Sequence, residues 1–245
     1  MPDVPNIPDI QQKTNHNQTI LFDSSHFSAP SQDIFSQKYW QSQNALIGQA
    51  AGRGTTYFFK YAQKEYVLRH YLRGGLVGKL LSDQYLFTGL KNTRAWQEFN
   101  LLKKMCLKGL PCPEPIAAQI TRHGLYYRAD IILAKIQNAN DLCHILQKQT
   151  VTSQTWQQIG HTIAQFHNQQ IYHHDLNIHN IMLDDAQKPW LIDFDKCSIK
   201  HGSTWKAANI SRLLRSFEKE KTLHNIYWQM TDWDTLLTAY YDSLS

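Results

Sequence analysis

Two neighbouring stretches decide the fold: Ile171-Tyr172-His173-His174-Asp175-Leu176-Asn177-Ile178-His179-Asn180-Ile181-Met182-Leu183 and Trp190-Leu191-Ile192-Asp193-Phe194-Asp195. Asn180 follows Asp175 by five residues, and Asp193 follows an apolar run that is typical of a strand. Residues 184–189 between the two apolar runs are rich in turn formers, which indicates a hairpin. Such a hairpin brings Asn180 and Asp193 to one end.

These three side chains are the groups that phosphoryl transfer requires. An acid such as Asp175 accepts the proton of an attacking hydroxyl, while Asn180 and Asp193 hold the Mg²⁺ ions that neutralise the phosphates of ATP. The pattern His-x-Asp-x4-Asn alone arises by chance with a probability of roughly a few per cent. The alternative is that both aspartates are turn or cap residues and that His173 is packed in a loop. The hairpin context favours the catalytic interpretation.

The glycines upstream of these stretches suggest a phosphate-binding turn. Residues 45–48, 55–61 and 65–71 read as three strands, and the first turn carries the spacing Gly48-x3-Gly52-x-Gly54. Glycines in such a turn let backbone N–H groups approach phosphate closely. An ordinary hairpin turn explains the segment equally well when it is read alone. Its place, about 120 residues before the catalytic loop, is the one expected in a kinase.

A helix is expected over residues 93–105, because apolar residues recur there at spacings of three or four. Glu98 lies beside the apolar face and is the candidate partner of a cation on the third strand. That cation is Arg69, and pairing with Glu98 would hold Arg69 against the α and β phosphates of ATP. The alternative is a solvated surface charge at Glu98.

The chain is expected to divide into an N-terminal arm, a small lobe and a large lobe. Residues 1–35 are rich in Pro, Asn, Gln and Ser and predict a loose arm with one short strand. Residues 36–136 predict a small lobe made of an antiparallel sheet and one helix. This lobe is expected to end in a hinge at residues 134–136. The backbone of the hinge, at Lys135, is the expected contact for adenine. Residues 137–245 predict a helical lobe. The predicted class is α+β.

The second half of the chain carries three further helical patterns. Ser153 is the expected N-cap of a helix that reaches Gln170, and residues 205–220 and 233–244 are amphipathic. About 50 residues follow Asp193, and no Ala-Pro-Glu occurs. We expect no full protein-kinase activation segment.

Composition excludes several other classes of protein. The 245 residues are 42% hydrophobic, enough for a substantial core, and the four cysteines form no Cys-x-x-Cys pair. We therefore expect reduced thiols and neither a disulfide framework nor a zinc site. No apolar run approaches the roughly 18 residues of a membrane span, and the first residues do not resemble a secretion signal. A protein neither secreted nor integral to a membrane is expected.

Positive charge is concentrated in one part of the chain. Between Lys60 and Lys108 there are ten Lys or Arg against three acids. Such a surplus attracts nucleotide, anionic sugar or anionic lipid. The candidates for contact with an anionic substrate are Arg73, Lys79, Lys91 and Arg94; the alternative is a solvated basic face. No pattern of a nucleic-acid module is present, so no nucleic-acid partner is expected.

Several motifs together resemble one enzyme family. They are Arg69-His70-Tyr71-x-Arg73-Gly74-Gly75, Asp83-x-Tyr85-x-Phe87-Thr88-Gly89-Leu90, Glu98-x3-Leu102, Gly109-Leu110-Pro111-x-Pro113-x-Pro115, His174-Asp175-Leu176-Asn177-x2-Asn180-Ile181-x-Leu183, Ile192-Asp193-Phe194-Asp195-Lys196 and Asn209-x2-Arg212-Leu213-x-Arg215-Ser216. Over residues 37–219 the chain resembles the lipopolysaccharide-core kinases of Gram-negative bacteria, and among them those acting on 3-deoxy-D-manno-octulosonic acid (Kdo).

The resemblance implies a two-lobed protein-kinase-like fold, use of ATP and Mg²⁺, and phosphorylation of the 4-hydroxyl of Kdo on Kdo-lipid A. It also implies peripheral attachment to the cytoplasmic face of the inner membrane, an anionic surface. The sequence departs from protein kinases at His174, Asn177 and Asp195, where those enzymes have Arg, Lys and Gly, and at Arg69, where they have Lys. His174 suggests control without activation-loop phosphorylation.

Two rival functions stay open on the sequence. The first is a kinase for another acceptor, either a heptose of the lipopolysaccharide core or a protein hydroxyl. The second is an inactive kinase fold that serves as a binding module; this rival predicts the loss of at least one of Asp175, Asn180 and Asp193, and all three are present.

Overall fold

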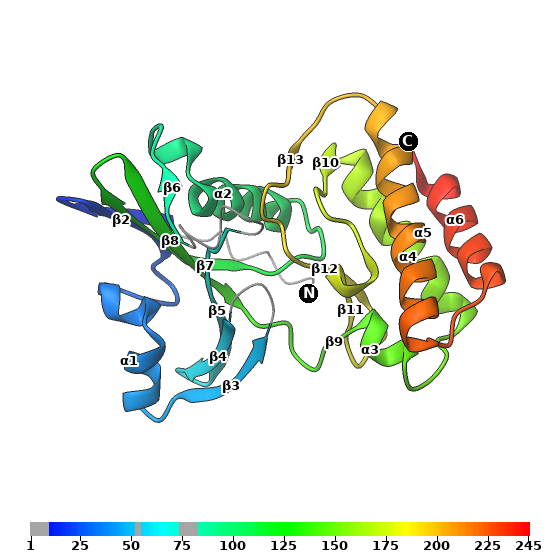
Figure 1. Ribbon diagram of the computed structural model, residues 1–245, viewed down its shortest axis with the longest axis horizontal. Helices are drawn as coiled ribbons and strands as arrows, with labels where there is room; N and C mark the ends of the chain where they lie inside the picture. The colour runs from blue at the N-terminus through cyan, green and yellow to red at the C-terminus, as the bar shows by residue number, and fades with distance from the viewer. Residues whose placement is uncertain (1–9, 52–54, 74–82) are drawn as a thin grey trace, which may run out of the picture. The chain divides into compact units, whose positions relative to one another are not determined.

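The computed structural model describes residues 10–51, 55–73 and 83–245 (Figure 1). The chain divides into two compact units, residues 1–107 with 113–135, and residues 108–112 with 136–245. Among the described residues, the first unit is built on an eight-stranded antiparallel sheet and the second is mainly helical. The α+β, kinase-like fold that the sequence predicts is therefore confirmed.

One antiparallel sheet organises the first unit. Its strand order is β1-β2-β7-β8-β5-β4-β3, and β6 pairs with β8. The strands are β1 (Ile10–Asn15), β2 (Gln18–Asp23), β3 (Leu46–Ala51), β4 (Thr55–Tyr61), β5 (Lys64–His70), β6 (Tyr85–Leu86), β7 (Pro115–His123) and β8 (Tyr126–Ala134). The helix α2 (Arg94–Leu107) packs on β7 and β8 and buries Ala95, Phe99, Leu102 and Met105, the face that the sequence predicts.

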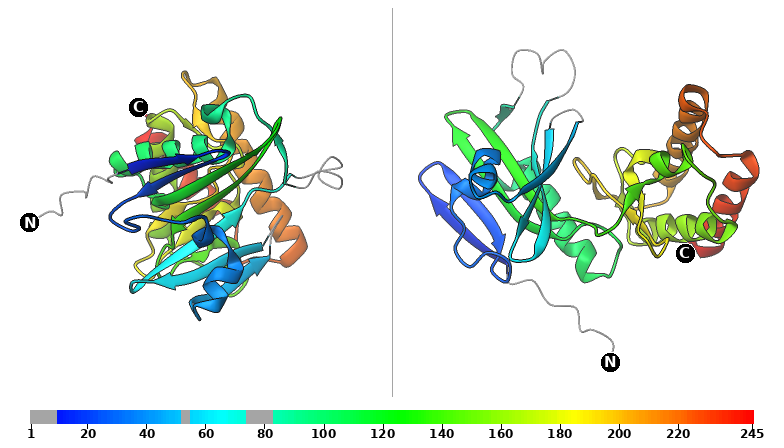
Figure 2. Two further views of the ribbon diagram at one scale, coloured as in Figure 1. Left: turned by 90° about the vertical axis from the view of Figure 1, so that its left-hand side faces the viewer. Right: turned by 90° about the horizontal axis from the view of Figure 1, so that it is seen from below.

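Residues 10–23 correct the expectation of a loose N-terminal arm. They form the hairpin β1–β2, and β2 pairs with β7, so the hairpin extends the sheet (Figure 2). Ile20, Leu21 and Phe22 are buried. The polar composition of this segment predicted little structure, but pairing with β7 satisfies the backbone and burial of this apolar island offsets the entropy of ordering it.

Aromatic side chains hold the far end of the sheet together. The ring of Trp40, on α1 (Gln37–Ser42), stacks on Phe59 with centroids 3.9 Å apart, and Phe59 stacks on Tyr66 at 5.2 Å. The indole N–H of Trp40 donates to the carbonyl of Ile34, in the 3₁₀ turn η1 (Gln32–Phe35), at 2.6 Å. This core fixes the strand pair β4–β5, whose end carries Arg69.

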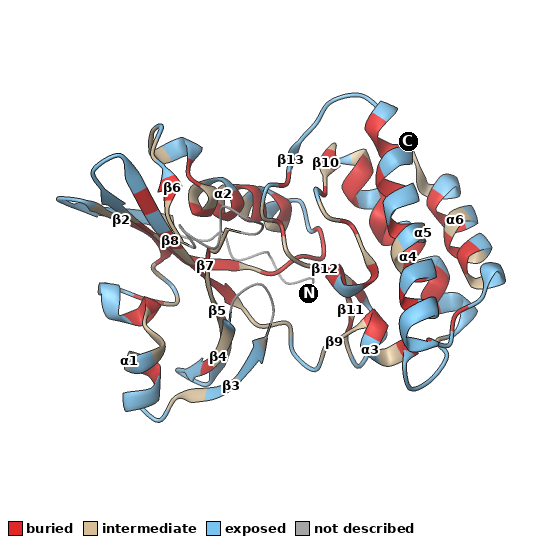
Figure 3. Ribbon diagram, in the orientation of Figure 1, coloured by how far each residue is buried: buried red, intermediate tan, exposed pale blue. Residues whose placement is uncertain are grey.

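The second unit places a small sheet against helices. Its helices are α3 (Leu142–Leu146), α4 (Ser153–Asn168), α5 (Thr204–His224) and α6 (Met230–Ser243); its short elements are β9 (Asn140–Asp141), β10 (Ile171–Tyr172), η4 (Ile178–Asn180), β11 (Ile181–Leu183), β12 (Pro189–Leu191) and β13 (Ser198–Ile199). Each helix has a buried and an exposed face (Figure 3). The predicted hairpin is present as β11–β12.

The start and the packing of α4 differ from a simple reading of the sequence. Thr152, rather than Ser153, is the N-cap, because its hydroxyl accepts from the backbone N–H of Thr155 at 3.1 Å. At Gly160 the helix approaches α6 so closely that a Cβ would lie 2.2 Å from the carbonyl oxygen of Leu236. Glycine at this position therefore permits the close packing of α4 on α6.

Candidate active site

Asp175 and Asn180 are joined directly in the loop that follows β10. The side-chain nitrogen of Asn180 donates to the backbone carbonyl of Asp175 at 2.8 Å, and Asn177 donates to the same oxygen at 2.9 Å. Because a carbonyl only accepts, the bond identifies which end of the Asn180 amide is nitrogen. The amide oxygen of this buried side chain is therefore the atom left for a ligand.

Asp193 is attached to the same loop through its neighbour Ile192. The N–H of Ile192 donates to the carbonyl of Asn180 at 3.0 Å, and the carbonyl of Ile192 accepts from Nε2 of His173 at 2.9 Å. Asp193 itself has φ +62°, a left-handed conformation that is uncommon for residues other than glycine and that concentrates at functional sites. Hydrogen bonds, mostly to backbone atoms, thus connect the segments that carry the three predicted residues.

His173 acts in these hydrogen bonds as a neutral donor. It is buried, and burial is the main cause that lowers its pKa. Its ring lies against Phe194, with centroids 5.0 Å apart, and Phe194 is buried in turn against Phe166. His173 therefore supports the backbone beside Asp193 as a hydrogen-bond donor.

An arginine from α5 contacts the predicted catalytic acid. Nη1 of Arg212 lies 2.8 Å from Oδ1 of Asp175, and the two side chains are 47% and 35% exposed. Solvent screens a pair this exposed, so its contribution to folding is small. The contact instead orients the carboxylate.

The donor set of the loop suits magnesium. Asn180 offers an amide oxygen and Asp193 a carboxylate, and oxygen ligands of this kind are those that Mg²⁺ prefers. The amide bond to Asp175 presets the oxygen of Asn180, as described above. The residues present therefore fit the predicted metal.

Arg69 and Glu98 form the expected ion pair in the first unit. Nη2 of Arg69 lies 2.5 Å from Oε1 of Glu98, and the hydroxyl of Tyr71 donates to Oε2, also at 2.5 Å. The side chain of Glu98 is 1% exposed, so the alternative of a solvated surface charge is wrong. Burial raises the pKa of Tyr71 well above its usual value, which keeps its hydroxyl protonated as a donor.

The glycine turn is only partly described. Gly48 lies in β3 opposite Phe58, and a Cβ there would meet Phe58 at an ordinary 3.6 Å, so this position does not demand glycine. Gly52 and Gly54 lie outside the described residues. A phosphate-binding role for this turn stays a prediction.

The hinge offers fewer groups to adenine than the sequence suggests. The N–H of Lys135 donates to the carbonyl of Glu65 at 3.0 Å, and its ammonium lies 2.6 Å from the carboxylate of Glu65. The N–H of Ala134 donates to the carbonyl of Glu114. A donor to adenine must therefore come from another hinge group than the N–H of these two residues.

Two of the four candidate substrate residues converge on a tyrosine. The guanidinium groups of Arg73 and Arg94 each lie 5.0 Å from the ring centroid of Tyr85, and Arg94 also donates to the Tyr85 hydroxyl at 2.6 Å. Nε of Arg73 is buried and has no hydrogen-bond partner among the described residues. Lys91 is exposed in the 3₁₀ turn η3 (Leu90–Asn92), and Lys79 lies outside the described residues.

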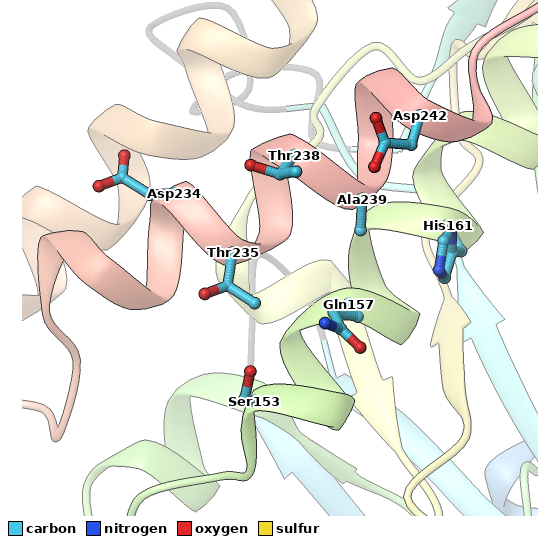
Figure 4. A pocket seen from close by; sticks show the side chains of 8 residues that line it. All are labelled: Ser153, Gln157, His161, Asp234, Thr235, Thr238, Ala239 and Asp242. Atoms are coloured by element: carbon cyan, nitrogen blue, oxygen red, sulfur yellow. The ribbon is translucent and has the colours of Figure 1, made fainter.

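A surface hollow in the second unit lies apart from the predicted site residues. It encloses about 500 Å³ and is lined by side chains of α4 and α6 (Figure 4), namely Ser153, Gln157, His161, Asp234, Thr235, Thr238, Ala239 and Asp242. None of the predicted site residues lines it.

In the part of the chain that is described, no helix has the length and apolarity needed to cross a membrane.

Sequence reasoning missed the tyrosines and the arginine that hold the candidate groups. Tyr71 lies two residues after Arg69, so extended geometry directs both side chains to one side, and this spacing was an available signal. Arg212 stands in a recognisable motif, but its sequence position does not reveal contact with Asp175, because the contact depends on how α5 packs.

Comparison with known proteins agrees with this geometry. Residues 37–240 match the family described as "Lipopolysaccharide kinase (Kdo/WaaP) family". A "3-deoxy-D-manno-octulosonic acid kinase" of Vibrio parahaemolyticus is 47% identical over 230 residues, covering 94% of this chain and 97% of the relative. Proteins with the same description from Photobacterium profundum and Haemophilus influenzae are 45% and 46% identical, covering 91% and 95% of this chain and 95% and 100% of the relatives.

Proposed function

The chain belongs to the lipopolysaccharide kinase (Kdo/WaaP) family, and from that premise we propose that it transfers the γ-phosphate of ATP to the 4-hydroxyl of Kdo on Kdo-lipid A. The observation that carries the proposal is the hydrogen-bonded array of Asp175, Asn180 and Ile192-Asp193, in a chain 43–47% identical to enzymes described as Kdo kinases. An inactive binding module has no need to keep all three groups.

Asp175 is the residue proposed to act on the acceptor. Its carboxylate accepts a hydrogen bond from the sugar hydroxyl and takes the proton as the hydroxyl oxygen attacks the γ-phosphorus. The bond from phosphorus to the bridging oxygen breaks, and ADP leaves. Arg212 holds Oδ1 of Asp175 at 2.8 Å, which limits the orientations of the base.

Asn180 and Asp193 are proposed to hold Mg²⁺, which when bound neutralises charge on the phosphates of ATP. The preset amide of Asn180 and the left-handed backbone of Asp193 support this role. His173, neutral and buried, keeps the carbonyl of Ile192 in place beside Asp193.

Arg69 is proposed to contact the α and β phosphates of ATP. The buried carboxylate of Glu98 accepts from both Arg69 and Tyr71, so the guanidinium of Arg69 is fixed before nucleotide binds. Gly48, Gly52 and Gly54 are proposed to line the same phosphates. Lys135 is proposed to border the adenine, through a group other than its N–H.

Arg73 and Arg94 are proposed to bind the anionic groups of the acceptor, together with Lys79 and Lys91. Two guanidinium groups against one tyrosine ring form a local concentration of positive charge. Kdo carries a carboxylate and lipid A carries phosphates, and guanidinium binds both kinds of anion well.

We propose that the protein is peripheral to the cytoplasmic face of the inner membrane. Leu86 and Leu125, at the β6–β8 pairing, are 57% and 70% exposed. Arg122 lies beside them, 4.7 Å from the ring centroid of Phe87. Exposed apolar side chains next to a cation suit the interface of an anionic bilayer.

Product mass tests the proposed reaction directly. Purified protein is incubated with ATP, Mg²⁺ and Kdo-lipid A, and the lipid is analysed by mass spectrometry. We expect the mass of Kdo-lipid A to rise by one phosphate, with the group located on the 4-hydroxyl by fragmentation. Transfer to a core heptose or to protein, with none to Kdo-lipid A, would overturn the acceptor and keep the kinase.

A further inference from the structure

One face of α5 touches the catalytic loop at three points. Asn209, Arg212 and Ser216 are separated by three and four residues, the spacing that places side chains on one face of a helix. Their partners are the carbonyl of His173, the carboxylate of Asp175 and the N–H of Ile178. The contacts therefore span the loop on both sides of Asp175.

Each of these bonds has an assigned direction. Nδ2 of Asn209 donates to the carbonyl of His173 at 2.8 Å, and Nη1 of Arg212 donates to Oδ1 of Asp175 at 2.8 Å. The hydroxyl of Ser216 donates to the carbonyl of Leu213 at 2.6 Å, so its oxygen accepts from the N–H of Ile178 at 3.0 Å. The three contacts therefore join the loop to α5 at defined donor and acceptor atoms.

Asn209 is itself anchored from its far side. With its nitrogen on His173, its oxygen accepts from Nε2 of His167 at 3.2 Å, and Nδ1 of His167 then accepts from the Tyr240 hydroxyl at 2.8 Å. His167 and Tyr240 come from α4 and α6. All three side chains are buried, so this chain of hydrogen bonds is shielded from water and ties α5 to the helical core.

We propose that this face of α5 sets the position of the catalytic base, and that Arg212 is the positioning residue that orients the Asp175 carboxylate. Asn209 and Ser216 hold the loop backbone before and after Asp175, and Arg212 holds the side chain. This inference rests on the proposed role of Asp175, but the hydrogen bonds themselves can be tested without knowing the acceptor.

A half-exposed contact that orients a base should affect turnover more than stability. In Arg212→Met we expect kcat to fall about 10- to 100-fold, because a small misplacement of a catalytic group is enough for such a loss. KM for ATP and the melting temperature should stay close to those of the wild type. Arg212→Lys keeps a cation and should recover part of kcat. Arg215→Met, an exposed arginine on the same helix, is the matched control and should retain wild-type kcat.

Hydrogen exchange of the intact protein supplies an independent reading. In Ser216→Ala the N–H of Ile178 loses its acceptor, so its exchange should speed up while the amides of α4 keep their protection. This measurement does not depend on the acceptor, so it remains informative if Kdo-lipid A proves to be the wrong substrate. The proposal is overturned if Arg212→Met turns over within twofold of the Arg215→Met control, or if Ile178 exchange is unchanged in Ser216→Ala.

Discussion

Two arginine–carboxylate pairs, Arg69–Glu98 in the sheet unit and Arg212–Asp175 in the helical unit, have the same chemistry in opposite surroundings. The carboxylate of Glu98 is 1% exposed and also accepts from Tyr71, whereas that of Asp175 is 35% exposed and its arginine 47%. Burial makes a broken pair expensive, because the remaining charge cannot return to water. When the pair is exposed, breaking it costs little folding free energy, and the carboxylate stays accessible to a substrate.

The difference separates two tasks that a kinase must perform. Glu98 does not need to meet the acceptor; it needs to keep one arginine fixed, and a buried site with two donors serves that purpose. In the proposed mechanism Asp175 must reach a hydroxyl, and its contact with Arg212 is one that solvent weakens. The following experiments test this division, beginning with the largest expected effect.

Removal of the proposed catalytic carboxylate should strongly reduce transfer without unfolding the protein. In Asp175→Ala we expect turnover to fall by about 10²- to 10⁴-fold, the usual contribution of a general base. ATP binding, measured by calorimetry, should persist. Asp185→Ala is the control, since Asp185 is an exposed aspartate in the β11–β12 turn, bonded to Asn138. Equal turnover of the two variants would rule out Asp175 as the base.

Breaking the buried Arg69–Glu98 pair should instead lower the stability of the fold. We expect Glu98→Gln to lower the free energy of unfolding by about 3–5 kcal/mol, because Arg69 is left charged and poorly paired. Urea denaturation measures this change. The double variant Arg69→Met/Glu98→Leu should regain much of the stability, since both charges are gone, yet bind ATP weakly. Full ATP affinity in the double variant would contradict the nucleotide role of Arg69.

Acid should weaken the helical unit that holds Asp175 through α5. Burial lowers the pKa of His167 from 6.5 to about 4, so the folded protein keeps this ring neutral where the unfolded chain already binds a proton. The stability linked to His167 is therefore present above pH 6.5 and lost between about pH 6.5 and 4, by up to about 3 kcal/mol. Urea denaturation across this range should show a shallower loss in His167→Gln. An identical loss in variant and wild type would contradict the assignment.

The smallest effect is expected at the partly exposed pair of the hinge. Glu65 and Lys135 lie 2.6 Å apart with side chains 28% and 33% exposed. Glu65→Gln should change the free energy of unfolding by only about 0–1 kcal/mol. This substitution keeps the size of the side chain and so serves as the partly exposed counterpart of Glu98→Gln. A loss as large as that of Glu98→Gln would show that burial does not explain the contrast between the pairs.

Local patterns were sufficient for the elements that carry the chemistry. The pairing of Arg69 with Glu98, 29 residues apart, was expected from the arrangement typical of kinases, but the β11–β12 hairpin and the apolar face of α2 follow from short-range periodicity. Such features depend on neighbours a few residues away, which the sequence displays directly. Roles in binding and catalysis stay predictions at every one of these residues.

Features made by distant partners were not visible in the sequence. The β1–β2 hairpin looked like a loose arm because its stabilising partner, β7, lies far along the chain. The sequence predicts that the N–H of Lys135 is available to adenine, but in the structure this N–H donates to the carbonyl of Glu65. The left-handed backbone conformation at Asp193 could not be predicted, because the residue there is not a glycine.

The sequence by itself determined the fold class and predicted the chemical groups of the site, namely Asp175, Asn180 and Asp193. Only the tertiary structure decided how those groups are held, because Arg212 lies 37 residues beyond Asp175 and meets it through the packing of α5 on the loop. Spacing along a chain specifies side chains that share one element. Contact between elements depends on how their buried faces pack, and that is settled by the whole core together.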